Sequence, residues 1–174
     1  MSETNQQDVF QDGAEQEKLR LIQHNFGAAA ANYVTSNVHA SGQDLDWLVE
    51  AAALTGSERV LDVATGGGHT AFALAPYAAE IVALDLTRPM LEAAQKEAVA
   101  RGFTTIHYLE GDAQALPCED ESFDVVTCRQ AAHHFPRVQQ AVREWARVLK
   151  PGGKLLLVDS TSPEEADAEA LLHE

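Results

Sequence analysis

The sequence contains no long hydrophobic run. No segment reaches the roughly 18 uncharged apolar residues that a membrane-spanning helix needs. The first residues, MSETNQQDVFQDG, also lack the basic and apolar regions of a secretion signal. We therefore expect a cytoplasmic protein without a membrane span.

Cysteine is scarce as well, and the chain contains only Cys118 and Cys128. Their spacing matches neither a CxxC pair nor a mixed cysteine and histidine zinc motif. We therefore expect no disulfide framework and no zinc site, and we interpret both thiols as ordinary small side chains in a reducing compartment.

Basic residues are also few: 12 Lys and Arg stand against 27 Asp and Glu, which gives a net charge of −15. Such a field repels phosphate backbones and anionic lipid, so nucleic acid and membrane surfaces are not expected as partners. The 174 residues, 45% of them hydrophobic, are enough for one globular domain with its own core.

From Arg59 onward, short apolar runs alternate with segments of helical composition. The expected strands are RVLDVA, EIVALD, TTIHYL, FDVVTC and KLLLVD, and the expected helices span about 69–76, 89–101 and 137–149, with a last piece from about Pro163. Their alternation predicts an α/β fold of Rossmann-like type, with three αβα layers and a mostly parallel sheet of five visible strands. The runs are almost continuously apolar, which predicts strands buried on both faces. Pro151, Gly152 and Gly153 are expected to end a helix before the fifth strand.

The N-terminal third has a different pattern. Residues 13–31 predict an amphipathic helix, in which Leu19, Ile22 and Phe26 are spaced three and four apart. A second helix is expected at about 44–54, with Leu45, Leu48, Val49 and Ala52 on one face. We interpret residues 1–56 as a helical cap and residues 57–174 as the ligand-binding domain.

Candidate functional residues stand where the expected strands end. These residues are Asp62 with the glycine loop after it, Asp85, Asp112, and the segment RQAAHHF. In an open parallel sheet, ligands bind at the carboxyl ends of the strands, near the point where the strand order reverses. The sequence therefore predicts that these residues surround one site.

The glycine loop VLDVATGGGHTA admits two ligands. Gly66, Gly68 and Ala71 satisfy the G-x-G-x-x-A dinucleotide fingerprint, and Asp85 stands where a ribose ligand is expected, so a nicotinamide-dependent oxidoreductase stays open. Asp62, however, has no Lys or Arg near it between positions 60 and 87, and a pyrophosphate beside it would be repelled. A ligand with a cationic end, such as S-adenosylmethionine, fits that carboxylate better.

Five segments together give a family resemblance. VLDVATGGGHTA, VALDLTRPML, GDAQALP, FDVVTCRQAAHHF and RVLKPGGKLLLVD resemble the Rossmann-like S-adenosylmethionine-dependent methyltransferases of the ubiquinone/menaquinone-biosynthesis type, from about Arg59 to Asp159. The resemblance implies methyl transfer to a small-molecule acceptor by direct displacement, with S-adenosylhomocysteine as product and no metal. It also implies a helical segment over the pocket, at NFGAAAANYVTSNVHASGQDLDWL.

The resemblance also assigns site residues. It places Asp85 at the ribose hydroxyls, Leu86 against the adenine and Asp112 at the adenine amino group. It implies that the cofactor contacts are Asp62, Ala64, Thr65, Gly66, Gly68, Asp85, Leu86, Met90, Gly111, Asp112, Ala113 and Arg129. Ala64 stands where the family's commonest pattern has a third glycine.

Each of these assignments has a simpler structural alternative. Asp62 and Asp85 can act as caps near helix N-termini, and Asp112 can be a turn former after Gly111. His133 and His134 can shape a pocket, and one of them can act as a general base, whereas adjacent histidines poorly suit a metal site. The other candidates for the acceptor side are Arg129 in the passage to the acceptor, and Tyr33, His39 and His69 at the border of the cavity.

The end of the chain gives one further expectation. The family's sheet continues after the fifth strand with a helix and two more strands, whereas this chain ends 15 residues after Asp159. We therefore expect a shortened sheet with an open edge, which a second copy or a partner chain can cover. A non-catalytic cofactor-binding subunit with the methyltransferase fold stays open as an alternative function.

Overall fold

The computed structural model describes residues 6–34 and 41–160, the first helix partly by its backbone alone. In chain order the elements are α1 (Gln6–Val34), α3 (Gln43–Ala52), β1 (Arg59–Val63), α4 (His69–Leu74), β2 (Glu80–Asp85), α5 (Arg88–Arg101), β3 (Ile106–Glu110), β4 (Phe123–Arg129), the short 3-10 helix η1 (Ala132–His134), α6 (Val138–Val148) and β5 (Leu149–Val158). The predicted alternation of strands and helices is confirmed.

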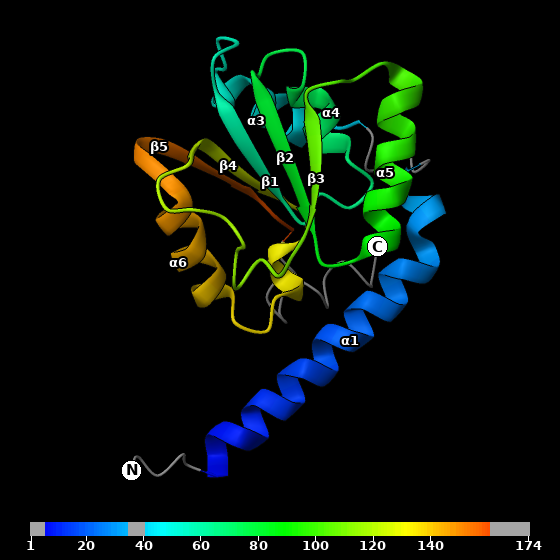
Figure 1. The fold of residues 1–174 in the computed structure, drawn as a ribbon, viewed down its shortest axis with the longest axis vertical. Helices are drawn as coiled ribbons and strands as arrows, with labels where there is room; N and C mark the ends of the chain where they lie inside the picture. The colour runs from blue at the N-terminus through cyan, green and yellow to red at the C-terminus, as the bar shows by residue number, and fades with distance from the viewer. Residues whose placement is uncertain (1–5, 35–40, 161–174) are drawn as a thin grey trace, which may run out of the picture.

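The five strands form one sheet in the order β3-β2-β1-β4-β5 (Figure 1). Every pairing in it is parallel, as the sequence predicts. The chain builds outward from β1 to β3 and then returns to the other side of β1 with β4. The strand order therefore reverses at the carboxyl end of β1, between β2 and β4, which is where this class of sheet binds ligands.

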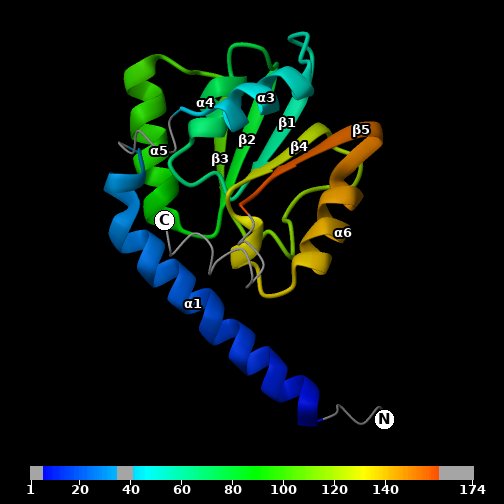
Figure 2. The same cartoon turned by 180° about the vertical axis from the view of Figure 1, so that it is seen from behind.

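Helices cover both faces of the sheet, which gives the three predicted layers (Figures 1 and 2). One core lies between the sheet and α6, around the fully buried Trp145 and Phe123. The other core lies under α3, α4 and α5, where Phe72 stacks on Phe103. This second core also buries Leu48 on the predicted apolar face of α3.

The prediction of strands buried on both faces is correct only for β1, β2 and β4. The edge strand β3 has a single buried residue, Ile106. The other edge strand, β5, pairs only with β4 in the described part of the chain, and its Leu155 and Leu157 are 37% and 47% exposed. An edge strand has a neighbour on one side only, so its apolar side chains are less completely covered. A partner chain at the β5 edge stays a prediction.

The start of β5 differs from its prediction. The strand begins at Leu149 rather than at Lys154, because Leu149 already pairs with Phe123. The next pair joins Val125 to Lys154, so the Pro-Gly-Gly segment forms an irregularity inside the strand rather than a turn before it. A β-bulge arises when one strand of a pair contains one or more extra residues, and glycine accommodates the bulged backbone well.

Helix α1 is longer than predicted and begins at Gln6 (Figure 2). Its C-terminal half packs on the domain, where the Gln23 side-chain amide donates a 3.0 Å hydrogen bond to the backbone carbonyl of Leu86. Its N-terminal half extends beyond the body of the domain in both views. The helix predicted from about Pro163 lies outside the described residues. In the described ranges, no helix combines the length and apolarity that crossing a membrane requires.

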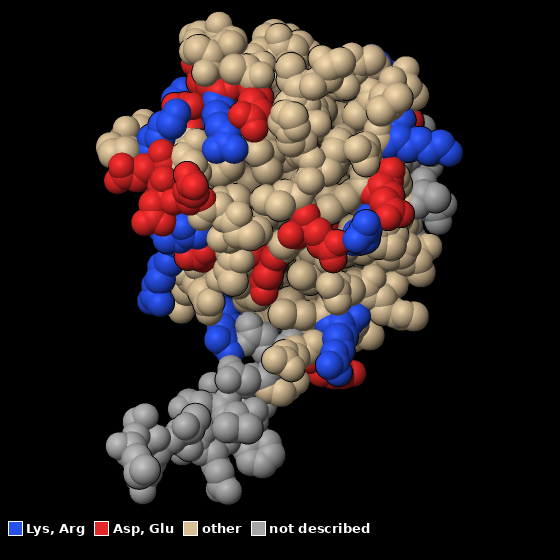
Figure 3. All heavy atoms as spheres, in the orientation of Figure 1, with Lys and Arg blue, Asp and Glu red and all other residues tan. Residues whose placement is uncertain are grey.

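The surface drawn in Figure 3 carries acidic and basic side chains side by side. No continuous basic patch is visible on that face, and this agrees with the net charge of −15.

Gly68 provides a test of the loop between β1 and α4. It caps α4 with a φ of +85°, and a Cβ there would lie 2.6 Å from the Phe72 ring. Gly102 has nearly the same φ, +79°, but open space around it. We expect Gly102→Ala to cost about 1 kcal/mol of unfolding free energy from backbone strain alone. Gly68→Ala adds a steric clash and should cost about 2–5 kcal/mol.

The measurement is urea unfolding of both variants beside the parent chain. The two glycines share their backbone conformation, so the difference between the variants isolates the packing against Phe72. Equal destabilisation by both substitutions would show that the ring does not constrain the loop.

Candidate functional site

A cavity of about 280 Å³ opens at the carboxyl ends of β1, β2 and β4. Its volume is near the lower end of the range for small-molecule sites, roughly 300–1,000 Å³. The predicted site residues that line it are Asp62, Ala64, Thr65, Gly66, His69, Asp85, Leu86, Met90, Gly111, Asp112, Ala113, Arg129, His133 and His134. The fold therefore brings together the strand ends that the sequence singled out.

Asp62 is the most deeply placed acid of the site, at 1% exposure. Its carboxylate accepts hydrogen bonds from the Thr65 hydroxyl at 2.6 Å and from the Thr127 hydroxyl of β4 at 2.7 Å. The backbone N–H of Ala71, in the first turn of α4, also donates to it. The pKa of Asp62 is raised to about 6, mainly by burial and to a smaller extent by the nearby Asp85, whereas these hydrogen bonds oppose the shift. Asp62 therefore has the predicted cap role at α4, and its contact with a ligand stays a prediction.

Asp85 ends β2 and ties two loops together. One carboxylate oxygen accepts from the backbone N–H of Gly66 at 2.9 Å and the other from that of Thr87 at 2.8 Å. Thr87 is itself the residue that precedes α5, so Asp85 does not bind the first turn of that helix, and a simple capping role is wrong. Burial raises the pKa of Asp85, although the backbone donors oppose the shift.

The glycine loop holds backbone conformations that L-residues rarely adopt. Ala64 has a φ of +54°, which explains why glycine is the commoner residue at this position, and Gly66 has a φ of +52°. Gly68 is not among the residues that line the cavity, and its cofactor contact stays a prediction. It allows α4 to begin against the Phe72 ring.

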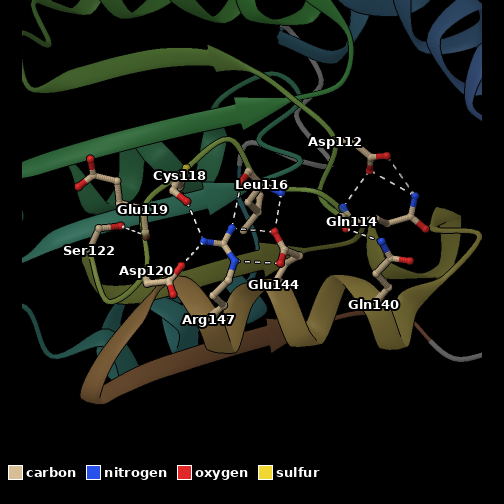
Figure 4. Close-up of polar contacts among 10 residues, drawn as sticks. All are labelled: Asp112, Gln114, Leu116, Cys118, Glu119, Asp120, Ser122, Gln140, Glu144 and Arg147. Carbon is tan, nitrogen blue, oxygen red and sulfur yellow. Dashed lines mark hydrogen bonds and ion pairs between the residues drawn. The ribbon is translucent and has the colours of Figure 1, made fainter.

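Asp112 lies in a turn after β3 that Gln114 holds in place (Figure 4). The backbone N–H of Gln114 donates to Asp112 Oδ1 at 2.8 Å, and the side-chain amide of Gln114 lies 3.3 Å from both carboxylate oxygens. The Gln114 side-chain oxygen accepts from the backbone N–H of Arg137, just before α6. Asp112 is thus a turn former, as the alternative stated, and also borders the cavity.

An ion-pair network from α6 anchors the rest of that loop (Figure 4). The Arg147 guanidinium donates to both oxygens of Glu144 at 2.9 and 2.8 Å, to Asp120 at 2.6 Å, and to the carbonyls of Leu116 and Cys118. The Arg147 hydrogen bonds hold the pKa of Glu144 below its usual value. Glu144 in turn accepts from the backbone N–H of Leu116. The loop that carries Asp112 is therefore attached to α6 on its far side.

Arg129 ends β4 and is the one permanently cationic side chain among the described residues that line the cavity. Its Nε donates to Asp44 Oδ2 at 2.6 Å, and the Arg129 side chain is 7% exposed. This hydrogen bond is the main reason that the pKa of Asp44 is lowered. The pair links the start of α3 to the site and already balances the charge of Arg129.

The adjacent histidines have different surroundings. The Nδ1 of His133 lies 2.6 Å from Asp159 Oδ1, and the backbone N–H of His133 donates to Asp159 Oδ2 at 3.0 Å. The His134 ring lies between the His133 ring, 3.9 Å away, and the edge of Phe26 on α1, 5.1 Å away, measured between centroids. Burial, and then the neighbouring His133, lower the pKa of His134.

Some site residues are not among those proposed from the sequence. The missed groups are the wall Leu19, Ile22 and Phe26 of α1, the hydroxyl of Thr127, and the carboxylates Asp44 and Asp159. The spacing of the α1 residues indicated an apolar face but not what that face covers. His39 and the side chain of Tyr33 lie outside the described residues, so their place in the pocket stays a prediction.

The site combines three strand-end carboxylates with an apolar wall. Arg129, the one permanently charged basic side chain that lines it in the described part of the chain, is already paired with Asp44. This charge distribution suits a ligand with a cationic end and hydroxyl groups, and it disfavours a pyrophosphate. The class of protein that the fold and the site define is a Rossmann-like α/β domain with an acidic, partly apolar cavity at the switch point of its sheet.

Comparison with known families agrees with this class. Residues 61–157 match the family described as "Methyltransferase domain". The chain belongs to this family, whose fold is the class I, Rossmann-like one, and the ubiquinone/menaquinone-biosynthesis methyltransferases are among its relatives.

Two relatives and two solved structures illustrate the likeness. An uncharacterized methyltransferase, YcgJ of Bacillus subtilis, is 44% identical over 80% of this chain, and its crystal structure aligns with a TM-score of 0.68 at 43% identity over 74% of this chain and 55% of YcgJ. A putative methyltransferase of Bacillus halodurans aligns with a TM-score of 0.69 at 49% identity, covering 75% of this chain and 57% of its own. The ubiquinone/menaquinone biosynthesis C-methyltransferase UbiE of Dinoroseobacter shibae is 37% identical over 86% of this chain.

This chain spans 55% of the length of YcgJ and 63% of the length of the UbiE relative. The relatives therefore contain further sequence that has no counterpart here. None of these matches favours the nicotinamide-dependent oxidoreductase.

Asp62→Asn is expected to stabilise the ligand-free chain at neutral pH. The pKa of Asp62 is about 6 when folded and about 3.9 in an unfolded chain, so the folded state keeps a proton that the unfolded state loses between these values. The contribution of Asp62 to the unfolding free energy therefore falls as the pH rises from about 4 to 6 and stays low above pH 6. An amide carries no charge, so the variant should gain up to about 3 kcal/mol at pH 7 and little at pH 4.

Urea unfolding at both pH values checks this expectation, and Asp124→Asn is the control with the opposite sign. Hydrogen bonds from the Arg59 backbone and Lys150 lower the pKa of Asp124, so its amide variant should lose stability at pH 7. A loss of stability at pH 7 in both variants would contradict the account of Asp62.

Proposed function

We propose that this chain binds S-adenosylmethionine in the cavity and transfers its methyl group to a small, largely apolar acceptor. The observation that carries the proposal is the acidic site itself: Asp62, Asp85 and Asp112 stand at three strand ends, and the Arg129 side chain is paired with Asp44. The family and the relatives named as methyltransferases support it.

Each of the three carboxylates contacts a different part of the ligand. Asp85 accepts from the ribose hydroxyls, with Leu86 and Met90 against the adenine. Asp112 accepts from the adenine amino group, and Asp62 faces the positively charged methionine end. Burial removes water from the Asp62 carboxylate, which raises its pKa because the ionised form loses its solvation. A bound cation compensates for that lost solvation and so stabilises the ionised form.

The acceptor side is formed by the apolar face of α1 and by the loop after β4. Leu19, Ile22 and Phe26 of α1 line the cavity together with Phe135 and the histidine pair, and Phe26 contacts the His134 ring. Direct displacement at a methyl group requires that the nucleophile, carbon and sulfur be aligned and that water be excluded. The apolar wall excludes water from the reacting atoms, and it favours an acceptor with little charge.

Calorimetric titration with S-adenosylmethionine, S-adenosylhomocysteine and NADH tests the proposal. We expect heat from the first two ligands and none from NADH. Asp85→Ala should weaken binding about 10- to 100-fold, because hydrogen bonds to a charged group contribute about 1.5–3 kcal/mol. Asp124→Asn lies near the start of β4, at the end of the sheet opposite to the cavity, so it is the control and should bind as the parent does. Binding of NADH alone would overturn the proposal in favour of an oxidoreductase.

The pH dependence of binding tests the role of Asp62 separately. Its carboxylate must be ionised to hold the ammonium, so affinity for S-adenosylmethionine should fall up to about tenfold per pH unit below about 6. Above pH 6 the affinity should be flat, and Asp62→Asn should bind weakly with no change across this window. A parent chain whose affinity is independent of pH between 5 and 7 would contradict this assignment.

A further inference from the structure

We propose that Thr127 of β4 is a positioning residue for Asp62: its buried hydroxyl orients the carboxylate and keeps it ionised for the cationic end of the ligand. This inference deepens the proposed function and rests on it, because Asp62 is the acid that meets the ammonium there. Its evidence is one contact between neighbouring strands at the carboxyl end of the sheet.

The sheet brings the two side chains together. β1 and β4 are neighbours (Figure 1), and Asp62 and Thr127 are Cα partners in their parallel pairing. Paired residues of neighbouring strands point to the same face of a sheet, so the hydroxyl and the carboxylate lie side by side. The Thr127 hydroxyl donates to Asp62 Oδ1 at 2.7 Å, whereas the carbonyl of Leu61 is 3.5 Å away. The carboxylate is therefore the main acceptor of this hydroxyl.

Packing does not explain the hydroxyl. Thr127 is fully buried, and the row of paired residues across the sheet continues with Ala83 beyond Asp62 and with Leu156 on the other side. Valine has almost the same shape as threonine, is also favoured in strands, and brings no polar atom into a core. A buried hydroxyl costs free energy unless it is hydrogen-bonded, so the contact with Asp62 is what makes threonine favourable here.

Thr127 acts through Asp62 and not on a ligand directly. It is not among the residues that line the cavity, whereas Asp62 and Thr65 are. Thr65 donates to the other carboxylate oxygen, Oδ2, at 2.6 Å. The carboxylate is therefore held from the loop by Thr65 and from the sheet by Thr127. Groups on strands are held more precisely than groups on loops, so we assign the fixed orientation of the carboxylate to Thr127.

The same contact favours the ionised form of the acid. A hydroxyl that donates a hydrogen bond to an ionised carboxylate stabilises that form. The pKa of Asp62 is raised to about 6, mainly by burial, and the hydrogen bonds from Thr65 and Thr127 oppose this shift. Thr127 therefore keeps a larger fraction of Asp62 ionised near neutral pH than burial alone would allow, and the ionised form is the one that attracts a cation.

Other titratable and charged side chains also lie around Asp62. Asp85 at the end of β2 raises the pKa of Asp62 by its charge. Cys128, the next residue of β4, keeps its proton, because burial and then the charge of Asp62 raise the pKa of its thiol. His69 at the start of α4 and Arg129 at the end of β4 line the same cavity. Because the like charge of Asp85 disfavours the ionised acid, the hydroxyl donors matter more at this position.

Unfolding at two pH values tests the contact without a ligand. Thr127→Val removes the hydroxyl and keeps the shape, so it should raise the folded-state pKa of Asp62 by about one unit. That shift costs stability at a pH above the new value and almost none near pH 4, where the folded chain keeps the carboxyl protonated. Relative to the parent, the unfolding constant of Thr127→Val should therefore rise about tenfold more at pH 8 than at pH 4.

Two variants control this measurement. Thr127→Ser keeps the hydroxyl and loses a methyl group, so its loss of stability should be the same at both pH values. Thr104 is exposed before β3, at the end of the sheet opposite to the cavity, so Thr104→Val should resemble the parent at both. A loss in Thr127→Val that is equal at pH 4 and pH 8 would overturn the proposal, and so would a valine variant that is unfolded at both. A valine variant that unfolds only at pH 8 has the predicted sign.

Calorimetric titration with S-adenosylmethionine at pH 6 and pH 8 tests the consequence for the ligand. Relative to the parent at the same pH, Thr127→Val should bind about fivefold more weakly at pH 6 and nearly as tightly at pH 8, where the acid is ionised in both chains. Thr127→Ser and Thr104→Val should follow the parent at both values. A valine variant that binds as the parent does at pH 6, or that is weakened equally at both values, would overturn the positioning role.

The two measurements separate this inference from the proposed function. A parent chain that does not bind S-adenosylmethionine at either pH overturns the proposed function, and the unfolding data then decide by themselves whether Thr127 keeps Asp62 ionised. A chain that binds the ligand, but in which Thr127→Val loses equal stability at both pH values, overturns the inference and leaves the proposed function in place.

Discussion

The burial of one carboxylate at the end of the central strand is the constraint on which the rest of the site depends. Asp62 sits at 1% exposure where β1 meets the glycine loop, and its pKa is raised to about 6 mainly by that burial. Two hydroxyls and one backbone N–H hold it, and none of them carries a charge. Such an arrangement costs stability in the ligand-free chain, and a cationic ligand removes that cost.

The surrounding structure serves to keep this acid in place. Thr127 reaches it from β4, so the strand order that puts β4 beside β1 also completes the site. The second acid, Asp85, binds the glycine loop from β2 through Gly66, and thus joins both βα loops at the switch point. The loop of Asp112 is held from outside by Gln114 and Arg147. Each acid is therefore fixed by the scaffold before a ligand arrives, as preorganised binding requires.

The two sides of the cavity differ in what holds them. In the proposed function, the cofactor side is built on strand ends with buried hydrogen bonds, whereas the acceptor side uses the apolar face of α1. Helix α1 contacts the domain through its second half, including the bond from Gln23 to Leu86. Because the acceptor wall is one helix face rather than a strand-end network, the choice of acceptor can change without disturbing the acids.

Local signals in the sequence predicted most of the fold and the strand-end acids that line the cavity. Continuous apolar runs between helical segments indicated the parallel sheet, and strand-end acids indicated Asp62, Asp85 and Asp112. The edge strands were predicted less well, because exposure depends on the number of neighbours and not on composition; β5 is the example. Contacts across the sequence, such as His133 with Asp159, were missed, because they follow from the order of the strands.

Other differences have equally local causes. Gly68 matches a ligand-binding fingerprint, and its lack of a Cβ also allows contact with Phe72, a fact that spacing alone does not reveal. The Pro-Gly-Gly segment indicates a helix stop, although Leu149 before it already pairs in the sheet. In the second case the pattern is compatible with two structures, and strand pairing decides between them.

The pKa of the Asp62 carboxyl, followed by carbon-detected NMR without and with saturating S-adenosylmethionine, tests the central claim most directly. The account predicts a value near 6 in the ligand-free chain and a decrease of at least one unit with the ligand, because a cation favours the ionised carboxylate. A value near 3.9 in both states would contradict the claim that this site stores an unfavourable buried charge for a cationic ligand.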